Sequence, residues 1–158
     1  MNISMTVTGA KELQRMLTRL ERKEASKIVR KETRDSQKMV MRPTIGGKAL
    51  GMVGGRMGTE IAKNLTIRAM TKMKRGSYGA KVIIKPHDAF MYVSADGTRS
   101  YIPNAIEYGH AGPGDAGGAK VAAPIPFQRQ AYEEKRRPLA EYFAKKVTKA
   151  IELAARVR

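Results

Sequence analysis

The first forty residues change from an alternating pattern to a helical one. Apolar and polar residues alternate from residue 3 to residue 8, which is the period of a half-buried strand. From Leu13 to Val40 the apolar positions recur at three- and four-residue steps among good helix formers. Thr8 can cap this helix, and Pro43 is expected to end it. At about 1.5 Å per residue, the pattern predicts a helical rod of roughly 50 Å.

Glycine interrupts the periodicity after this helix. Residues 43–58 contain six glycines, which predicts a flexible loop. The Gly46-Gly47-Lys48 sequence within it is not a phosphate-binding loop, because the spacing is wrong and Ala49 follows the lysine. A short helix capped by Thr59 is expected to run through Asn64.

Strand patterns fill the centre of the chain. Residues 65–74 alternate between apolar and polar positions, and a turn at residues 75–79 would reverse the chain into the β-branched segment 80–85. Pro86 ends this hairpin. Residues 90–94 and 99–102, joined by a tight turn, are expected to add a third and a fourth strand to the same sheet.

The last third of the chain is predicted to be mostly helical. Pro103 is expected to start one helical turn, and a glycine-rich loop then covers about residues 109–120. The last forty residues carry a helical apolar stripe that contains Pro138. Because proline lacks an N–H and fixes φ, it predicts either a kink or two helices, over residues 126–136 and 138–157.

These patterns predict one α+β domain over residues 1–158. It would combine a long N-terminal helix, a small antiparallel sheet built on a central hairpin, and a C-terminal helix kinked or split at Pro138. The sequence has no Trp, three Phe and ten Met, a composition that specifies the shape of a core only weakly. We therefore expect neighbouring subunits to contribute to its stability.

Charge is the composition feature that bears most on function. The formal net charge is +17, from 31 Lys and Arg against 14 acids, and such a surface is usually matched by nucleic acid. An acidic protein neighbour is the alternative. Residues 43–87 carry nine basic residues and one acid, Glu60. The basic residues expected to face DNA are Lys63, Arg68, Lys72, Lys74 and Arg75.

This predicted basic stripe has a second interpretation. Lysines on an exposed strand can serve only to prevent pairing between the edges of two sheets. No helix-turn-helix, zinc-finger or RNA-recognition signature accompanies the stripe, so sequence-specific regulation is disfavoured.

Residues suited to catalysis or metal binding are few. There is no Cys, and His87 and His110 have no ligand partner at a helical spacing, so we expect no metal and no cofactor. Four acids lie in turns or loops, and a pairing of Asp96 with Glu107 in a metal-dependent nuclease is the only hydrolytic hypothesis left open. We expect a protein that is not an enzyme. We also expect no signal peptide and no membrane span.

Two short segments carry a resemblance to a known family. The first is Tyr101-Ile102-Pro103-Asn104-Ala105-Ile106-Glu107-Tyr108-Gly109, and the second is Ala123-Pro124-Ile125-Pro126-Phe127-Gln128-Arg129-Gln130-Ala131-Tyr132-Glu133. They resemble the Tyr-Ala-x-x-Val-Glu-Phe/Tyr-Gly and Pro-Phe-x-Arg-x-Ala elements of the tail-completion or minor tail proteins of long-tailed bacteriophages. The residues matching these elements are Glu107, Tyr108, Gly109, Pro126, Phe127, Arg129 and Ala131. The chain departs from the pattern at His110 and Gln130, where the family usually has Thr and often has Pro.

The resemblance implies a structural virion protein without catalytic activity. Such a subunit would form a ring, hexameric by the resemblance, that completes the tail and helps join it to the DNA-filled head. Its partners would be tail terminator or tube proteins and head connector proteins, with non-specific contact to packaged double-stranded DNA. It would be found in the virion, after assembly in the host cytoplasm. A free-standing basic nucleic-acid-binding protein is the alternative function.

Overall fold

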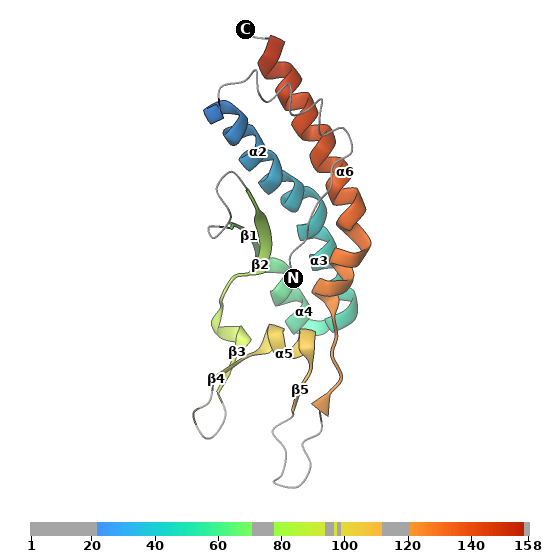
Figure 1. Ribbon diagram of the computed structural model, residues 1–158. Coiled ribbons are helices and arrows are strands. Elements are labelled where there is room, and N and C mark those ends of the chain that lie inside the picture. The colour runs from blue at the N-terminus through green and yellow to red at the C-terminus, as the bar shows by residue number, and fades with distance from the viewer. Residues whose placement is uncertain (1–21, 71–77, 94–96, 98, 112–120, 157–158) are drawn as a thin grey trace.

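A computed structural model of the chain describes residues 22–70, 78–93, 97, 99–111 and 121–156 (Figure 1). The predicted strand at residues 3–8, the start of the long helix and most of the glycine-rich loop after residue 109 lie outside these ranges. Helices and small antiparallel strand pairs make up the described part, so the predicted α+β class is confirmed.

The N-terminal helix does not end at Pro43, and this prediction was wrong. One helical run alternates α-helical and π-helical segments, and the residues at the segment boundaries keep right-handed helical backbone angles. A π-helical turn immediately precedes α3. Pro43 lies in the first turn of α3, where the N–H that proline lacks is not needed as a hydrogen-bond donor. The segments are α2 (Arg22–Ser36), η1 (Gln37–Met41), α3 (Arg42–Lys48) and η2 (Ala49–Val53).

The loop predicted over residues 43–58 is also helical. Gly54, with φ 67° and ψ −173°, is the only residue of this stretch outside a helix, and it separates η2 from α4 (Gly55–Lys63). Gly58 lies where α4 packs against η2: a Cβ built there would be 2.5 Å from the carbonyl oxygen of Ala49. At Gly58 the glycine therefore allows close packing rather than flexibility.

The pairing in the central hairpin is confirmed, but the first strand ends at Ala69 and is shorter than predicted, and residues 71–77 lie outside the described ranges. Strand β1 (Leu65–Ala69) pairs antiparallel with β2 (Ala80–Ile84), with Ile67 opposite Val82 and Arg68 opposite Lys81. Leu65 and Val82 are buried on one face of the pair, whereas Arg68 and Lys81 are exposed on the other. This is the alternation expected of an antiparallel pair with one face on the core.

The next two strands exist but do not extend that sheet. Strand β3 (Met91–Val93) pairs with β4 (Arg99–Tyr101), and these two form a separate two-stranded ribbon. The prediction of a single four-stranded sheet was therefore wrong. The short helix α5 (Ile102–Tyr108) follows, with Pro103 in its first turn as expected, and β5 (His110–Ala111) then pairs with β6 (Val121–Ala122).

The C-terminal helix α6 (Phe127–Arg156) is continuous through Pro138. Of the two alternatives, division into two helices was therefore wrong. Helices α6 and α2 lie side by side along the upper half of the molecule. Two ribbons, the β3–β4 and β5–β6 strand pairs, project at the opposite end (Figure 1). No helix in the described ranges combines the length and apolar character needed to cross a membrane.

The core is divided into two clusters along α6. The larger one joins α3, α4, the central hairpin and the first turns of α6, with Phe90 and Phe127 as its largest fully buried side chains. The smaller one contains Val147 and Ile151 of α6, against which Ala25 and Ile28 of α2 pack. Among the described residues, few apolar contacts join the far ends of α2 and α6.

Candidate functional site: a basic groove on α2

The structure describes only part of the predicted basic stripe. Lys72, Lys74 and Arg75 lie outside the described residues. Lys63 is exposed at the end of α4, and its Nζ lies 3.7 Å from Oε1 of Glu60. Arg68 is exposed directly opposite Lys81, so two cations share the solvent face of the hairpin. The described part of the stripe is thus a small basic patch.

A larger group of cations lies on α2 and on the start of η1, which continues the same helical run. They line a groove of about 400 Å³ together with Asp35 and with Ile67 from β1. The cations are Lys27, Arg30, Lys31, Arg34 and Lys38, all exposed. Their three- and four-residue spacing places them on one face of the helix. Sequence analysis did not single them out, although the spacing was visible.

The neighbouring groups leave most of this positive charge unpaired. Nζ of Lys31 lies 3.8 Å from Oε1 of the buried Glu32. Within the described ranges, none of the other four cations has a carboxylate oxygen within salt-bridge distance. The Arg30 guanidinium lies 4.7 Å from the centre of the Tyr78 ring, which orients it along the groove wall by a cation–π contact. The Tyr78 hydroxyl in turn donates a hydrogen bond of 2.8 Å to Ser26 Oγ.

The two segments that carry the family resemblance meet in space. Glu107 Oε2 accepts a hydrogen bond of 2.9 Å from the backbone N–H of Gln128, and its Oε1 accepts one of 2.9 Å from that of Arg129. These N–H groups are in the first turn of α6, which has no carbonyl partners of its own. Glu107 is 3% exposed. Glu107 is therefore a buried cap of α6 and not an exposed acid.

The other matching residues divide between core and surface. Phe127 and Ala131 are fully buried in the larger cluster, whereas Arg129 is exposed and Tyr108 is 77% exposed. Gly109 has φ 78°, a left-handed conformation that favours glycine, as the sequence suggested. These residues therefore build the start of α6 and do not converge on a catalytic pocket.

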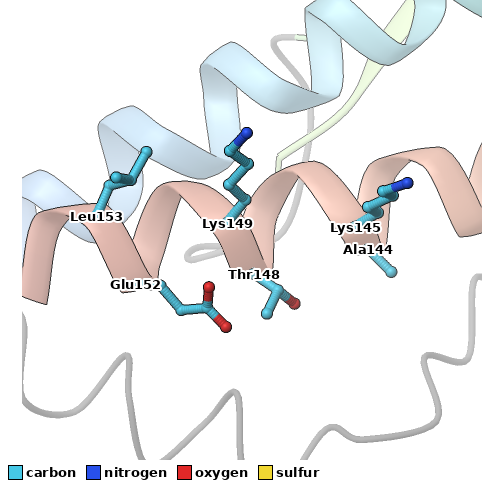
Figure 2. Close-up of a pocket in the computed structure, with 6 residues that line it drawn as sticks. All are labelled: Ala144, Lys145, Thr148, Lys149, Glu152 and Leu153. Carbon is cyan, nitrogen blue, oxygen red and sulfur yellow. The ribbon is translucent and has the colours of Figure 1, made fainter.

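A second depression, about 540 Å³, lies along the C-terminal half of α6. All six of its lining residues come from this one helix, and in Figure 2 Thr148 and Glu152 point to one side while Lys149 and Leu153 point to the other. Side chains that diverge from one helix face cannot enclose a substrate. This depression therefore offers no arrangement for catalysis.

The residues considered for hydrolysis are not brought together where they are described. Both carboxylate oxygens of Glu107 accept backbone hydrogen bonds, and Asp96 and Asp115 lie outside the described ranges. His87 accepts a hydrogen bond of 3.2 Å from the Ala89 N–H, and its ring lies edge-on to Phe90. Across the described part of the chain, no group of three His, Asp or Glu residues could hold a metal ion.

Two tyrosines and one glutamate have shifted pKa values. Burial raises the pKa of Tyr132, and a backbone hydrogen bond from Val82 partly opposes this; burial also raises the pKa of Tyr101. Hydrogen bonds to Lys135 and Lys48 lower the pKa of Glu134, which lies 3.0 Å from Lys48 and connects α6 to α3. None of these three groups lines the basic groove.

No family model, no curated protein and no solved structure matches this chain.

Proposed function

We propose that the chain is a non-catalytic structural protein of the neck or tail top of a long-tailed bacteriophage. It assembles into a ring, hexameric by the resemblance, that completes the tail and helps join it to the filled head. The observation that carries this proposal is the contact between Glu107 and the start of α6. It supports the proposal by giving a physical reason for the two matching segments to occur together: Glu107 of the first segment caps the helix that the second segment begins.

The projecting end of the molecule supports assembly. Met91, Tyr92 and Val93 of β3 are 41%, 47% and 55% exposed, and Tyr108 at the end of α5 is 77% exposed. A two-stranded ribbon is only marginally stable alone in water, and its strands keep unpaired outer edges. Contact with a neighbouring subunit would cover these apolar side chains and pair the open edges.

The proposed partners are those that the resemblance implies. Copies of this chain would pack through the projecting ribbons, while tail terminator or tube proteins and head connector proteins would bind above and below the ring. The positive surface then faces packaged DNA or acidic neighbours. The protein would be found in the virion after assembly in the host cytoplasm.

Assembly is tested by the native mass of the purified full-length chain. We expect a closed ring for the wild type, and a monomer for Val93→Asp with an unchanged circular dichroism spectrum. The control is Leu153→Asp, because Leu153 is 53% exposed but lies on α6, away from the ribbons. A wild-type chain that stays monomeric and is absent from purified virions would refute the proposal, and so would loss of the ring in both variants.

The basic groove on α2 favours one alternative, a free-standing nucleic-acid-binding protein. In that case the wild-type monomer would bind DNA tightly, and Val93→Asp would change neither its mass nor its affinity. Ring formation together with the expected effect of Val93→Asp would exclude this alternative.

A further inference from the structure

The five cations of the α2 groove repel one another. Lys27 and Lys31, Arg30 and Arg34, and Arg34 and Lys38 are like-charged pairs four residues apart. Each such pair costs an isolated helix about 0.2–0.5 kcal/mol. The fold therefore keeps an arrangement that weakens its own helix.

The acids of α2 offset this repulsion only in part. Glu32 is buried at 7% exposure, whereas Glu24 and Asp35 are half-buried three residues before Lys27 and four residues after Lys31. Opposite charges at these spacings stabilise a helix. Five cations and one acid, Asp35, line the groove, and this excess of positive charge favours a ligand that carries repeated negative charges.

We propose that the α2 groove binds the sugar-phosphate backbone of double-stranded DNA without sequence preference. This inference deepens the proposed function, since it assigns the polyanion contact to α2 instead of the hairpin. The cations run from Lys27 to Lys38, or about 16 Å of helix axis. That length corresponds to about five base-pair steps at roughly 3.4 Å each.

The lining of the groove favours a duplex over the other polyanions. Ile67 is its single apolar residue, so an acidic protein would find little of the apolar surface that usually anchors a protein interface. The Tyr78 ring is already covered by Arg30 and does not provide an open platform for unpaired bases. Lys and Arg side chains contact phosphates through charge alone or through a planar guanidinium fork.

The test compares two triple variants of the full-length chain that remove the same charge. The groove variant is Lys27→Gln, Lys31→Gln and Arg34→Gln; the control is Lys145→Gln, Lys146→Gln and Lys149→Gln on α6, where these lysines are also exposed. Glutamine forms helices about as well as lysine, so both variants should fold. Binding to a short labelled duplex is measured by fluorescence anisotropy between about 50 and 200 mM salt.

We expect the groove variant to bind about tenfold more weakly or worse, and the control to change by less than about threefold. The slope of log K against log salt should become shallower by about 2–3 in the groove variant, since each lost phosphate contact accounts for about 0.9. A double variant of the hairpin patch, Arg68→Gln with Lys81→Gln, should behave like the control. Equal losses in both triple variants would overturn the proposal, because the binding would then reflect net charge alone.

Binding to other polyanions and the native mass provide further tests. Binding of polyglutamate with no binding of duplex would identify an acidic protein as the ligand and overturn the proposal, as would tighter binding of single-stranded DNA. The native mass, measured on the same samples, separates this inference from the proposed function. A ring without groove-dependent DNA binding refutes only the groove, and a monomer with such binding refutes only the ring.

Discussion

Oε1 of Glu107 and the backbone N–H of Arg129 are joined by a 2.9 Å hydrogen bond, although 22 residues separate them in the chain. The other carboxylate oxygen accepts the N–H of Gln128 at 2.9 Å, so a single side chain caps two positions of α6. A negative charge is favourable at a helix N-terminus, where the peptide dipoles leave partial positive charge. Glu107 thus connects the end of α5 to the start of the longest helix.

Replacing Glu107 should destabilise the fold. Glu107→Gln keeps one acceptor but loses the charge, and should lower the free energy of unfolding by about 1–2 kcal/mol; Glu107→Ala should cost about 2–3 kcal/mol. Urea unfolding followed by circular dichroism measures both. Glu133→Gln is the control, because Glu133 is exposed on the same helix. Equal stability of Glu107→Ala and the wild type would show that the cap does not contribute.

Gly58 should be intolerant of any side chain. The Cβ of Gly58→Ala would be 2.5 Å from the Ala49 carbonyl oxygen, which is a backbone atom and cannot rotate away. The variant must therefore separate α4 from η2, and we expect a loss of about 1–3 kcal/mol in thermal or urea unfolding.

Gly47→Ala is the matched control for that substitution. Gly47 is exposed within α3, and a Cβ there meets no atom within 4 Å. Alanine should stabilise the helix by about 0.5–1 kcal/mol, because it restricts the unfolded chain more than glycine does. If both variants lose stability equally, the close approach at Gly58 is not the cause.

Alkaline pH should reveal the burial of Tyr132. Its pKa in the folded protein lies above the ordinary value of 10.0, so folding favours the neutral phenol. The resulting stabilisation is complete below the pKa of the unfolded chain and is lost as pH rises through the folded pKa. In Tyr132→Phe the alkaline decline in unfolding free energy should be smaller, and Tyr101 should supply the rest. The control is Tyr92→Phe, at an exposed tyrosine; an equal effect there would contradict the assignment.

The two clusters along α6 should differ in local stability. Ile151 is fully buried in the smaller cluster, and Ile151→Ala should cost about 2–4 kcal/mol locally. Hydrogen exchange should then quicken at residues 24–30 and 143–154 more than at residues 127–139. Ile61→Ala, in the larger cluster, should instead lower protection throughout the described helices. Uniform loss of protection in Ile151→Ala would show that the two clusters unfold together.

The central hairpin was predictable because its signal is local. Leu65 and Ile67 alternate with Thr66 and Arg68, and this alternation fixes both the strand and the face that packs on the core. The separate pairing of β3 with β4 was not predictable in the same way. Whether a segment forms a strand depends mainly on residues close to it in the sequence. Which other strand it pairs with depends on residues far away in the sequence.

Proline and glycine misled the sequence analysis between residues 43 and 58. A proline usually ends a helix. At Pro43 the helix continues, because the π-helical turn before it removes the need for the N–H that proline lacks. Glycine permits either flexibility or close packing, and sequence alone does not distinguish them. Gly58 is explained only by the Ala49 carbonyl nine residues earlier, once both helices are in place.

The cations of the groove were visible in the sequence, but their exposure was not. Glu24, Glu32 and Asp35 lie in the same stretch of sequence as these cations, so the segment looked like an ordinary mixed helix surface. The burial of Glu32 and the position of Ile67 at the groove wall arise from packing between α2, α6 and the hairpin. These contacts turn a mixed stretch of sequence into a positive surface.

The two π-helical turns each hold one residue more per turn than an α-helix would need, so deleting a single residue from Gln37–Met41 would let the backbone become regular. The shortened α-helical turn would rotate the chain about as far as the π-helical turn does, so later side chains of the run would keep their directions. Ile45 and Ala49 would then stay buried. A deletion inside α3 would instead rotate every later side chain by about 100° around the axis and turn apolar residues toward water. The π-helical turns are therefore the places where this helical run should best tolerate a change in its length.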